Sequence, residues 1–328
     1  MITLLCLLVT AGARAQSGGM TLIGSIGADG TPSRMVWDAS GDRVTIVTDG
    51  MFYRYPVDTD GNTAPAGTGQ SVDFKSKSYT LTDVSNSGVM AALSSDRQSI
   101  VIYEEPMNEA KAVRTIEPGF MMLSVAVSND GSKVLADSAE EIRTVVYDTA
   151  NGDQVYDLGG FSTAAPVYDS VLSGDGSHVV WHSRGTFAVQ DAETGTFGKT
   201  VSLWDFASSY ELSPDNQMLA VGIINDDYES GAVVFFDPQS GTESGRTLFG
   251  KTAPQELAYS ADGSVLMAAG GAALYRIDPQ SFEVLDQVMF VAADADDLRI
   301  SRIAPSADGS LCAVLLSSGK AYVVKNRE

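Results

Sequence analysis

A short polar phrase recurs seven times along the chain, each time directly after an apolar stretch. Each copy begins with Ser or Asp and ends with Gly or Asn, the residues that tight turns favour. The copies are Asp38-Ala39-Ser40-Gly41, Ser85-Asn86-Ser87-Gly88, Ser128-Asn129-Asp130-Gly131, Ser173-Gly174-Asp175-Gly176, Ser213-Pro214-Asp215-Asn216, Ser260-Ala261-Asp262-Gly263 and Ser306-Ala307-Asp308-Gly309. Their first residues lie 47, 43, 45, 40, 47 and 46 positions apart. A period of this length indicates a repeat protein whose units bury their apolar faces against one another.

The third repeat shows what one unit contains. Residues 121–127, 133–136, 143–147 and 154–158 are four short apolar or alternating segments, and polar turns separate them. Four such strands per repeat, with two turn types in a fixed order, are typical of a β-propeller blade. The sequence therefore predicts an all-β fold, a seven-bladed β-propeller of four-stranded antiparallel blades.

The two ends of the chain predict how the ring closes. After the seventh phrase, residues 310–316 and 321–325 supply a second and a third strand, and no outer strand follows. Residues 21–26 precede the first repeat and have no blade of their own. Pairing of these two segments would remove an exposed sheet edge, so we expect the N-terminal strand to close the ring.

The first fifteen residues resemble a secretion signal, with an apolar run over residues 2–10 and small residues before Gln16. We expect residues 1–15 to be a signal peptide and residues 16–328 to be one propeller domain, periplasmic or secreted. An uncleaved anchor is the alternative. Cys312 is then the single cysteine left, in an apolar run that predicts a core position rather than a nucleophile.

Acidic residues dominate the composition, with 42 Asp and Glu against 21 Lys and Arg. Loss of Arg14 with the signal takes the formal net charge from −21 to −22. Such a charge disfavours nucleic acid and anionic membranes, because both are bound through concentrated Lys and Arg. We expect a monomer that binds no nucleic acid and does not insert into a membrane once the signal is cleaved.

A second turn closes several repeats: Asp191-Ala192-Glu193-Thr194-Gly195, Asp237-Pro238-Gln239-Ser240-Gly241 and Asp278-Pro279-Gln280-Ser281. With these two turns the chain resembles the divergent WD40-like and YVTN-type propeller families over residues 21–325. The Gly-His that WD40 repeats place before the first strand is missing, and neither Trp37-Asp38 nor Trp204-Asp205 falls at the family position. The resemblance therefore implies the fold, and the usual His–Asp network is not carried over.

Four of the seven predicted blades carry a charged residue at the same position of the innermost strand. Four positions before each turn the copies carry Arg34, Leu81, Ser124, Asp169, Ser209, Glu256 and Arg302. Glu256, Arg302 and Arg34 fall on consecutive blades of the ring, and two arginines around one glutamate predict a spot that accepts a small anion. An internal ion-pair network is the alternative. Asp83 and Glu211, two positions before the turn where other copies are apolar, join the candidate ligand-binding residues.

Metal binding has two weaker candidates. Asp294, Asp296 and Asp297 form one acidic loop, and Asp226 and Asp227 form another. Carboxylates suit calcium, but neither loop has the Gly and the terminal Glu of a complete calcium loop. We predict no cofactor, and calcium remains an alternative to solvated acidic loops.

Signs of catalysis are sparse. His178 and His182 are the only histidines, and four residues on one strand span about 13 Å. No Gly-x-Ser-x-Gly elbow accompanies them. We therefore interpret the chain as a noncatalytic module that binds a protein partner or a small anionic ligand. The alternative is an enzyme, similar to a lactonase or a quinone-dependent dehydrogenase, with its site at the channel mouth.

Overall fold

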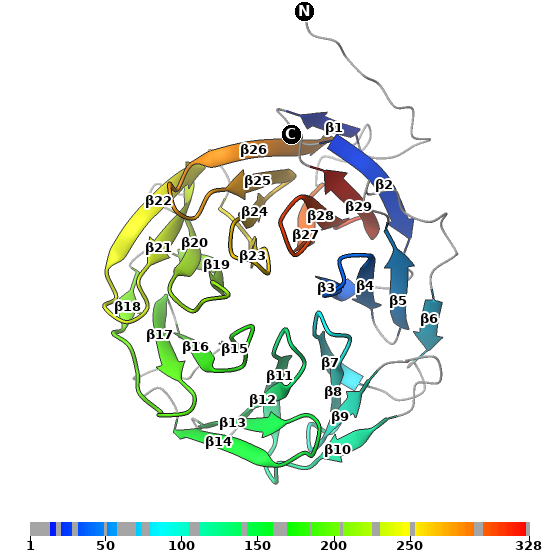
Figure 1. Cartoon of the computed structure of the whole chain (residues 1–328), viewed down its shortest axis with the longest axis vertical. Helices are drawn as coiled ribbons and strands as arrows, with labels where there is room; N and C mark the ends of the chain where they lie inside the picture. The colour runs from blue at the N-terminus through cyan, green and yellow to red at the C-terminus, as the bar shows by residue number, and fades with distance from the viewer. Residues whose placement is uncertain are drawn as a thin grey trace, which may run out of the picture.

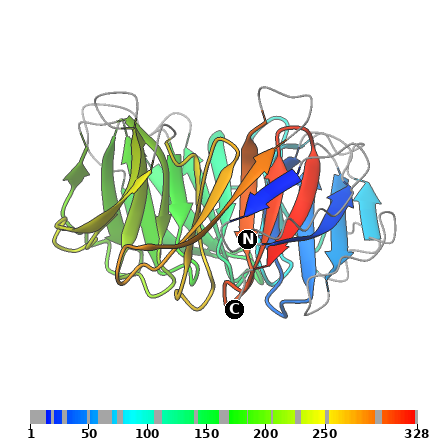
Figure 2. The same ribbon diagram turned by 90° about the horizontal axis from the view of Figure 1, so that it is seen from above.

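The computed structural model shows a ring of seven β-sheets arranged around a central axis (Figure 1). It describes residues 14–17, 21–27, 32–48, 51–57, 70–73, 79–104, 112–138, 143–159, 169–183, 185–203, 206–224, 230–249, 253–291 and 298–325. Seen edge-on, the sheets stand side by side and their strands cross the thickness of the disc (Figure 2). The predicted all-β fold of seven antiparallel blades is confirmed.

The first four blades are numbered here in chain order, each from its innermost to its outermost strand. Blade 1 contains β3 (Pro32–Trp37), β4 (Arg43–Thr48), β5 (Met51–Pro56) and β6 (Gln70–Asp73). Blade 2 contains β7 (Tyr79–Val84), β8 (Met90–Ser94), β9 (Ile100–Tyr103) and β10 (Arg114–Ile116). Blade 3 contains β11 (Met122–Val127), β12 (Lys133–Ser138), β13 (Arg143–Asp148) and β14 (Gln154–Gly159). Blade 4 contains β15 (Asp169–Leu172), β16 (His178–Ser183), β17 (Thr186–Asp191) and β18 (Val201–Ser202).

The remaining three blades follow the same order. Blade 5 contains β19 (Phe206–Leu212), β20 (Leu219–Ile224), β21 (Gly231–Phe236) and β22 (Glu243–Phe249). Blade 6 contains β23 (Glu256–Tyr259), β24 (Leu266–Gly270), β25 (Ala273–Ile277) and β26 (Val284–Val291). Blade 7 contains β27 (Ile300–Pro305), β28 (Leu311–Leu316) and β29 (Lys320–Lys325). Among the described residues, no helix is long and apolar enough to cross a membrane.

Two N-terminal strands extend the last two blades. β2 (Thr21–Gly27) pairs antiparallel with β29, with Thr21 opposite Lys325 and Gly27 opposite Lys320, and is the outermost strand of blade 7. β1 (Arg14–Ser17) pairs with β26 and adds a fifth strand to blade 6. Figure 1 shows both strands beside the C-terminal blades. β1 crosses the position after Ala15 where we expect signal cleavage, a pairing that the sequence did not predict.

The recurrent phrase forms the same hydrogen-bonded turn in successive blades. In blade 6 the hydroxyl of Ser260 donates to Asp262 Oδ1 at 2.7 Å, and the backbone N–H of Val265 donates to Ser260 Oγ at 3.1 Å. Gly263 follows with a φ of 72°, a conformation that a side chain disfavours. This turn fixes where each innermost strand ends, which sets the residues that face the centre of the ring.

Seven apolar clusters fill the spaces between neighbouring blades in the described structure. One of them joins blade 7 to blade 1, where Leu311, Ala313 and Val323 pack against Trp37 and Ile46. Seven interfaces between seven blades make the packing continuous around the ring, which explains how sheets with apolar residues on both faces stay buried. Cys312 lies in another of these clusters, 1% exposed, and burial raises the pKa of its thiol to about 12.

Candidate functional site

The innermost strands of all seven blades surround a central cavity of about 870 Å³. Its wall includes five ionisable side chains predicted from the repeat pattern: Arg34, Asp83, Glu211, Glu256 and Arg302. They come from β3, β7, β19, β23 and β27, so five of the seven blades each contribute one. A volume of this order is typical of a site for a small ligand.

Arg34 and Asp83 form an ion pair between blades 1 and 2. Arg34 Nε lies 2.9 Å from Asp83 Oδ1. The same carboxylate accepts the backbone N–H of Val84 at 2.9 Å and that of Val127, in blade 3, at 2.8 Å. Asp83 raises the pKa of Arg34 against the opposing effect of burial, and Glu211 and Glu256 raise it further. Asp83 thus interacts with groups from three blades, whereas 43% of the Arg34 side chain stays exposed.

Arg302 and Glu256 form a second ion pair between blades 7 and 6. Arg302 Nη1 lies 2.5 Å from Glu256 Oε1 and donates to the carbonyl oxygen of Ser301 at 2.6 Å. Burial raises the pKa of Glu256, and the charges of Arg302 and Arg34 oppose that shift. The sequence predicted a group of two arginines and one glutamate here. The cavity wall also contains the carboxyls of Asp83 and Glu211.

Glu211 differs from the other two carboxyls because the structure gives it no hydrogen bond or ion pair among the described residues. It lies on β19, partly buried in the cavity wall. Burial raises the pKa of its carboxyl to about 7; Arg34 opposes this shift, and Glu256 and Asp83 add to it. The side chain is therefore neutral in a large fraction of molecules near pH 7, when it can donate a hydrogen bond.

Two aromatic residues of the wall, Trp37 and Tyr259, were not predicted from the sequence. Among the described residues, the buried indole N–H of Trp37 and the buried hydroxyl of Tyr259 have no hydrogen-bond partner. Burial and the nearby charges of Glu211 and Asp215 raise the pKa of the Tyr259 hydroxyl. Both residues directly precede a turn phrase, where the other copies are aliphatic or Pro. A Trp or Tyr at a position that is aliphatic or Pro in the other copies could have indicated these two residues from the sequence.

Asp137 forms a buried polar cluster beside the cavity that the repeat pattern also did not indicate. Its Oδ2 accepts the hydroxyls of Ser124 at 2.6 Å and Ser170 at 2.5 Å, and its Oδ1 accepts that of Thr144. Burial raises the pKa of Asp137, and the three hydroxyls oppose the shift. Since Ser170 belongs to blade 4 and the others to blade 3, this cluster joins two blades.

Other candidate residues lie partly or wholly outside the described structure. Asp169 begins β15, and only its backbone is described. Asp226, Asp227, Asp294, Asp296 and Asp297 fall outside the described residues. Within the described part of the chain, no group of three or more His, Cys, Asp or Glu residues could hold a metal ion. The absence of a cofactor stays a prediction, and calcium binding at the two acidic loops stays its alternative.

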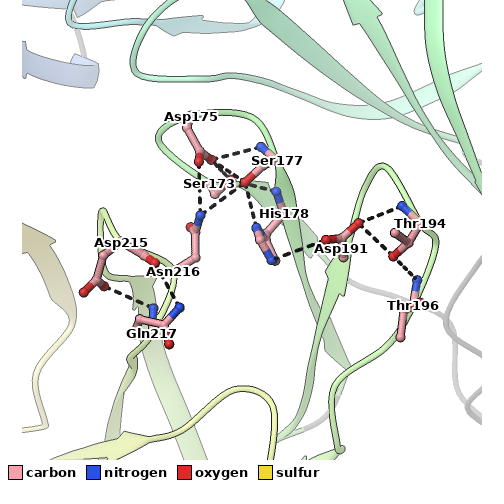
Figure 3. Close-up of polar contacts among 10 residues, drawn as sticks. All are labelled: Ser173, Asp175, Ser177, His178, Asp191, Thr194, Thr196, Asp215, Asn216 and Gln217. Carbon is pink, nitrogen blue, oxygen red and sulfur yellow. Dashed lines mark hydrogen bonds and ion pairs between the residues drawn. The ribbon is translucent and has the colours of Figure 1, made fainter.

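His178 belongs to a polar network between blades 4 and 5 (Figure 3). Its Nδ1 lies 2.7 Å from Ser177 Oγ, and its Nε2 lies 4.0 Å from Asp191 Oδ2. The Ser177 hydroxyl also lies 2.7 Å from Asp175 Oδ1, and Asn216 Nδ2 reaches it from blade 5 at 3.2 Å. The residue types are those of a Ser–His–Asp triad, but Asp175 and Asn216 also engage the hydroxyl. None of Ser177, His178 and Asp191 lines the central cavity.

His182 has a different environment. Its ring stacks on Phe187 with centroids 4.6 Å apart and lies 5.3 Å from the ring of Tyr210. Burial lowers its pKa, so the ring is neutral at physiological pH. The backbone N–H of Gly185 approaches His182 Nε2 at 3.4 Å. These contacts are those of a packed core histidine.

Comparison with known proteins supports the fold. No protein-family model matches the chain, and no curated protein matches it. Among solved structures, the chain is similar to the β-propeller domain of Cps50 (Swd1) from Myceliophteria thermophila. The TM-score is 0.66 at 14% sequence identity, over 93% of this chain and 99% of that chain. The chain is a seven-bladed β-propeller. At this identity the likeness concerns the fold alone, so the propeller's function has to be argued from its own residues.

Proposed function

We propose that this propeller is an exported, noncatalytic binding module whose small ligand, or the side chain of a protein partner, enters the central cavity. One observation carries the proposal: five blades each place an ionisable side chain in the wall of one cavity of about 870 Å³. Burial of charged groups is costly, so a fold that gathers five of them on innermost strands needs a compensating reason. Two ion pairs compensate four of these groups, and Glu211 is the fifth.

Export is the second part of the proposal. The apolar run of residues 2–10, the small residues before Gln16 and the net charge of −21 support it. An acidic surface also favours solubility at high local concentration. The WD40-like architecture supports a binding role in general, since this frame presents loops and a central channel without requiring a catalytic residue.

The test is a thermal-shift screen of the chain from Gln16 onward with small carboxylic acids, amines, sugars and short peptides. Hydrogen–deuterium exchange then locates each ligand that raises the melting temperature. We expect added protection on β3, β19 and β23, and none on the outer strands β14 and β22. Protection confined to the outer strands, or no stabilising compound in any class, contradicts the proposal.

A hydrolase is the second candidate, because Ser177, His178 and Asp191 bring triad residue types together. The distance of 4.0 Å between His178 and Asp191 exceeds a hydrogen bond, and Asp175 already accepts the Ser177 hydroxyl. We expect no turnover of 4-nitrophenyl acetate or of γ-lactones that Ser177→Ala removes. Turnover lost in both Ser177→Ala and His178→Ala would establish the hydrolase instead.

A further inference from the structure

In the cavity wall, two carboxylates have hydrogen-bond or ion-pair partners, whereas several donor groups have none. Asp83 forms an ion pair with Arg34 and accepts two backbone amides, and Glu256 pairs with Arg302. In contrast, Arg34 reaches Asp83 through Nε, and its terminal nitrogens make no hydrogen bond among the described residues. Two of the three wall carboxyls are therefore paired, and Arg34 keeps spare donors, in spite of the acidic composition of the whole chain.

Two more donors in the same wall have no partner. The indole N–H of Trp37 and the hydroxyl of Tyr259 are both buried, and these residues are 2% and 9% exposed. A buried polar group without a partner costs about 1 to 3 kcal/mol, so structures keep few of them without a reason. Arg34, whose side chain is 43% exposed, is the donor that a ligand can reach. It calls for a ligand with acceptor atoms, and an ammonium group has none.

We propose that the central cavity binds a small organic carboxylate, held by the terminal nitrogens of Arg34 and by the side chain of Glu211. This inference rests on the proposed binding function. A guanidinium suits the role because its forked N–H groups match the two oxygens of a carboxylate. Asp83 engages only Nε, and Arg34 lines the cavity, so the Nη groups are the donors left for a ligand. The sequence pattern predicted Arg302 as an anion-binding residue together with Arg34. In the structure, Glu256 and the Ser301 carbonyl already accept hydrogen bonds from Arg302.

Proton uptake follows from the position of Glu211. The charged and titratable groups around it are Arg34 on β3, Asp83 on β7, and Glu256 and Tyr259 on β23, with Arg302 on β27 beyond Glu256. Asp169 lies on the adjacent innermost strand β15. A ligand carboxylate brought into this group repels the ionised form of Glu211 and accepts a hydrogen bond from its protonated form. Its pKa, already about 7 because of burial, rises further when the ligand binds.

The expected consequence is a binding constant that depends on pH in one direction. Above pH 7 each bound carboxylate takes up one proton, so affinity falls by up to tenfold for each pH unit. For a cationic ligand the pH dependence has the opposite sign. Such a ligand favours the ionised form of Glu211, so binding releases a proton and affinity rises with pH. The pH dependence thus separates the two ligand classes without knowledge of the natural ligand.

The test uses succinate, glutarate, citrate and benzoate as carboxylate probes and putrescine and arginine methyl ester as cationic probes. Isothermal titration at pH 6, 7 and 8 measures affinity, and buffers of different ionisation enthalpy measure proton uptake. Arg34→Lys keeps the ion pair with Asp83 but loses the fork, so we expect carboxylate affinity to fall at least tenfold. Arg246→Lys is the matched control, because Arg246 pairs with Glu243 on an outer strand. Glu211→Gln should remove proton uptake.

The outcomes are distinct. A carboxylate that binds with proton uptake and is lost in Arg34→Lys but kept in Arg246→Lys supports the inference. A cationic probe that binds more tightly as pH rises overturns it and leaves the proposed binding function intact. A carboxylate that binds the wild type and Arg34→Lys with equal affinity also overturns the inference and leaves the proposed binding function intact. Absence of any stabilising compound in the wider screen overturns both.

Discussion

Asn216 of blade 5 donates its side-chain amide to Asp175 of blade 4, with Nδ2 3.2 Å from Oδ2. It occupies the place that Gly holds in the other six turn phrases and has a φ of 60°. The hydrogen bonds to Asp175 and, at 3.2 Å, to Ser177 give a reason for a side chain at a position where Gly is the easier residue. They also help to lower the pKa of Asp175, in which burial has the largest and opposite effect.

The first prediction follows from this contact. Asn216→Ala loses both hydrogen bonds and keeps a side chain at positive φ, so it should lower the free energy of unfolding by about 2 kcal/mol. Asn216→Gly loses the same bonds without the strain and should cost about 1 kcal/mol. Urea unfolding measures both. Gln217→Ala, at the exposed neighbouring position, is the control and should change stability by less than about 0.5 kcal/mol. Equal costs for Ala and Gly would show that the backbone conformation contributes nothing.

The second prediction concerns Asp137, which accepts three hydroxyls from two blades. Asp137→Ala leaves Ser124, Thr144 and Ser170 without this acceptor and should cost about 3 kcal/mol or more. Asp137→Asn keeps one carbonyl oxygen, and hydroxyls can rotate to accept from its amide, so a cost of about 1 to 2 kcal/mol is expected. Denaturant unfolding gives the order of the two variants, and exposed Asp153→Ala serves as the control. Asn as costly as Ala would mean that the negative charge, rather than its acceptor atoms, holds the cluster.

The strand pattern was predictable because local chemistry fixes it. Segments expected at 133–136 and 143–147 correspond to β12 (Lys133–Ser138) and β13 (Arg143–Asp148). Each turn phrase ends a strand at a defined residue, and alternation along the strand then decides which side chains face inward.

The pairing of the charged residues was not predictable in the same way. The repeat alignment placed Arg34 next to Arg302 and Glu256, but its guanidinium pairs with Asp83 of blade 2. A long side chain can reach groups at several levels of a channel, and the choice depends on atoms from several blades. Trp37 and Tyr259 were missed for a related reason: an aromatic in an apolar strand indicates a core position, and only the packed ring shows whether its polar atom has a partner.

The third prediction concerns the pairing of β2 with β29. Loss of β2 exposes the outer edge of blade 7, so a chain that begins at residue 28 should melt about 10 °C lower or aggregate. A chain that begins at residue 18 lacks β1 only and is the matched control, since β1 is an added fifth strand on blade 6. We expect this control to melt within about 3 °C of the full chain. Equal melting temperatures for the two truncations would refute closure of the ring by β2.

The last prediction is a pH dependence that Glu211 imposes on stability. Its pKa of 4.5 rises to about 7 in the folded protein, chiefly through burial. A raised pKa means that the stability contribution is complete below about pH 4.5 and is lost as pH rises to about 7, because the unfolded chain gives up its proton first. Glu211→Gln stays neutral at every pH. It should match the wild type at pH 4.5 and exceed it by about 1 to 2 kcal/mol at pH 8, a value reduced from the full linkage because the cavity admits water.

Chemical unfolding at pH 4.5, 6, 7 and 8 measures this difference, with Glu117→Gln as the control at an exposed position. Because position 117 is exposed, the control should change stability by less than about 0.5 kcal/mol. A Glu211→Gln variant that is less stable than the wild type at pH 8 would mean that the ionised carboxylate is stabilised by Arg34 across the cavity. In that case Glu211 belongs to a closed ion-pair network with Arg34 and Asp83, and it has no proton to supply to a ligand.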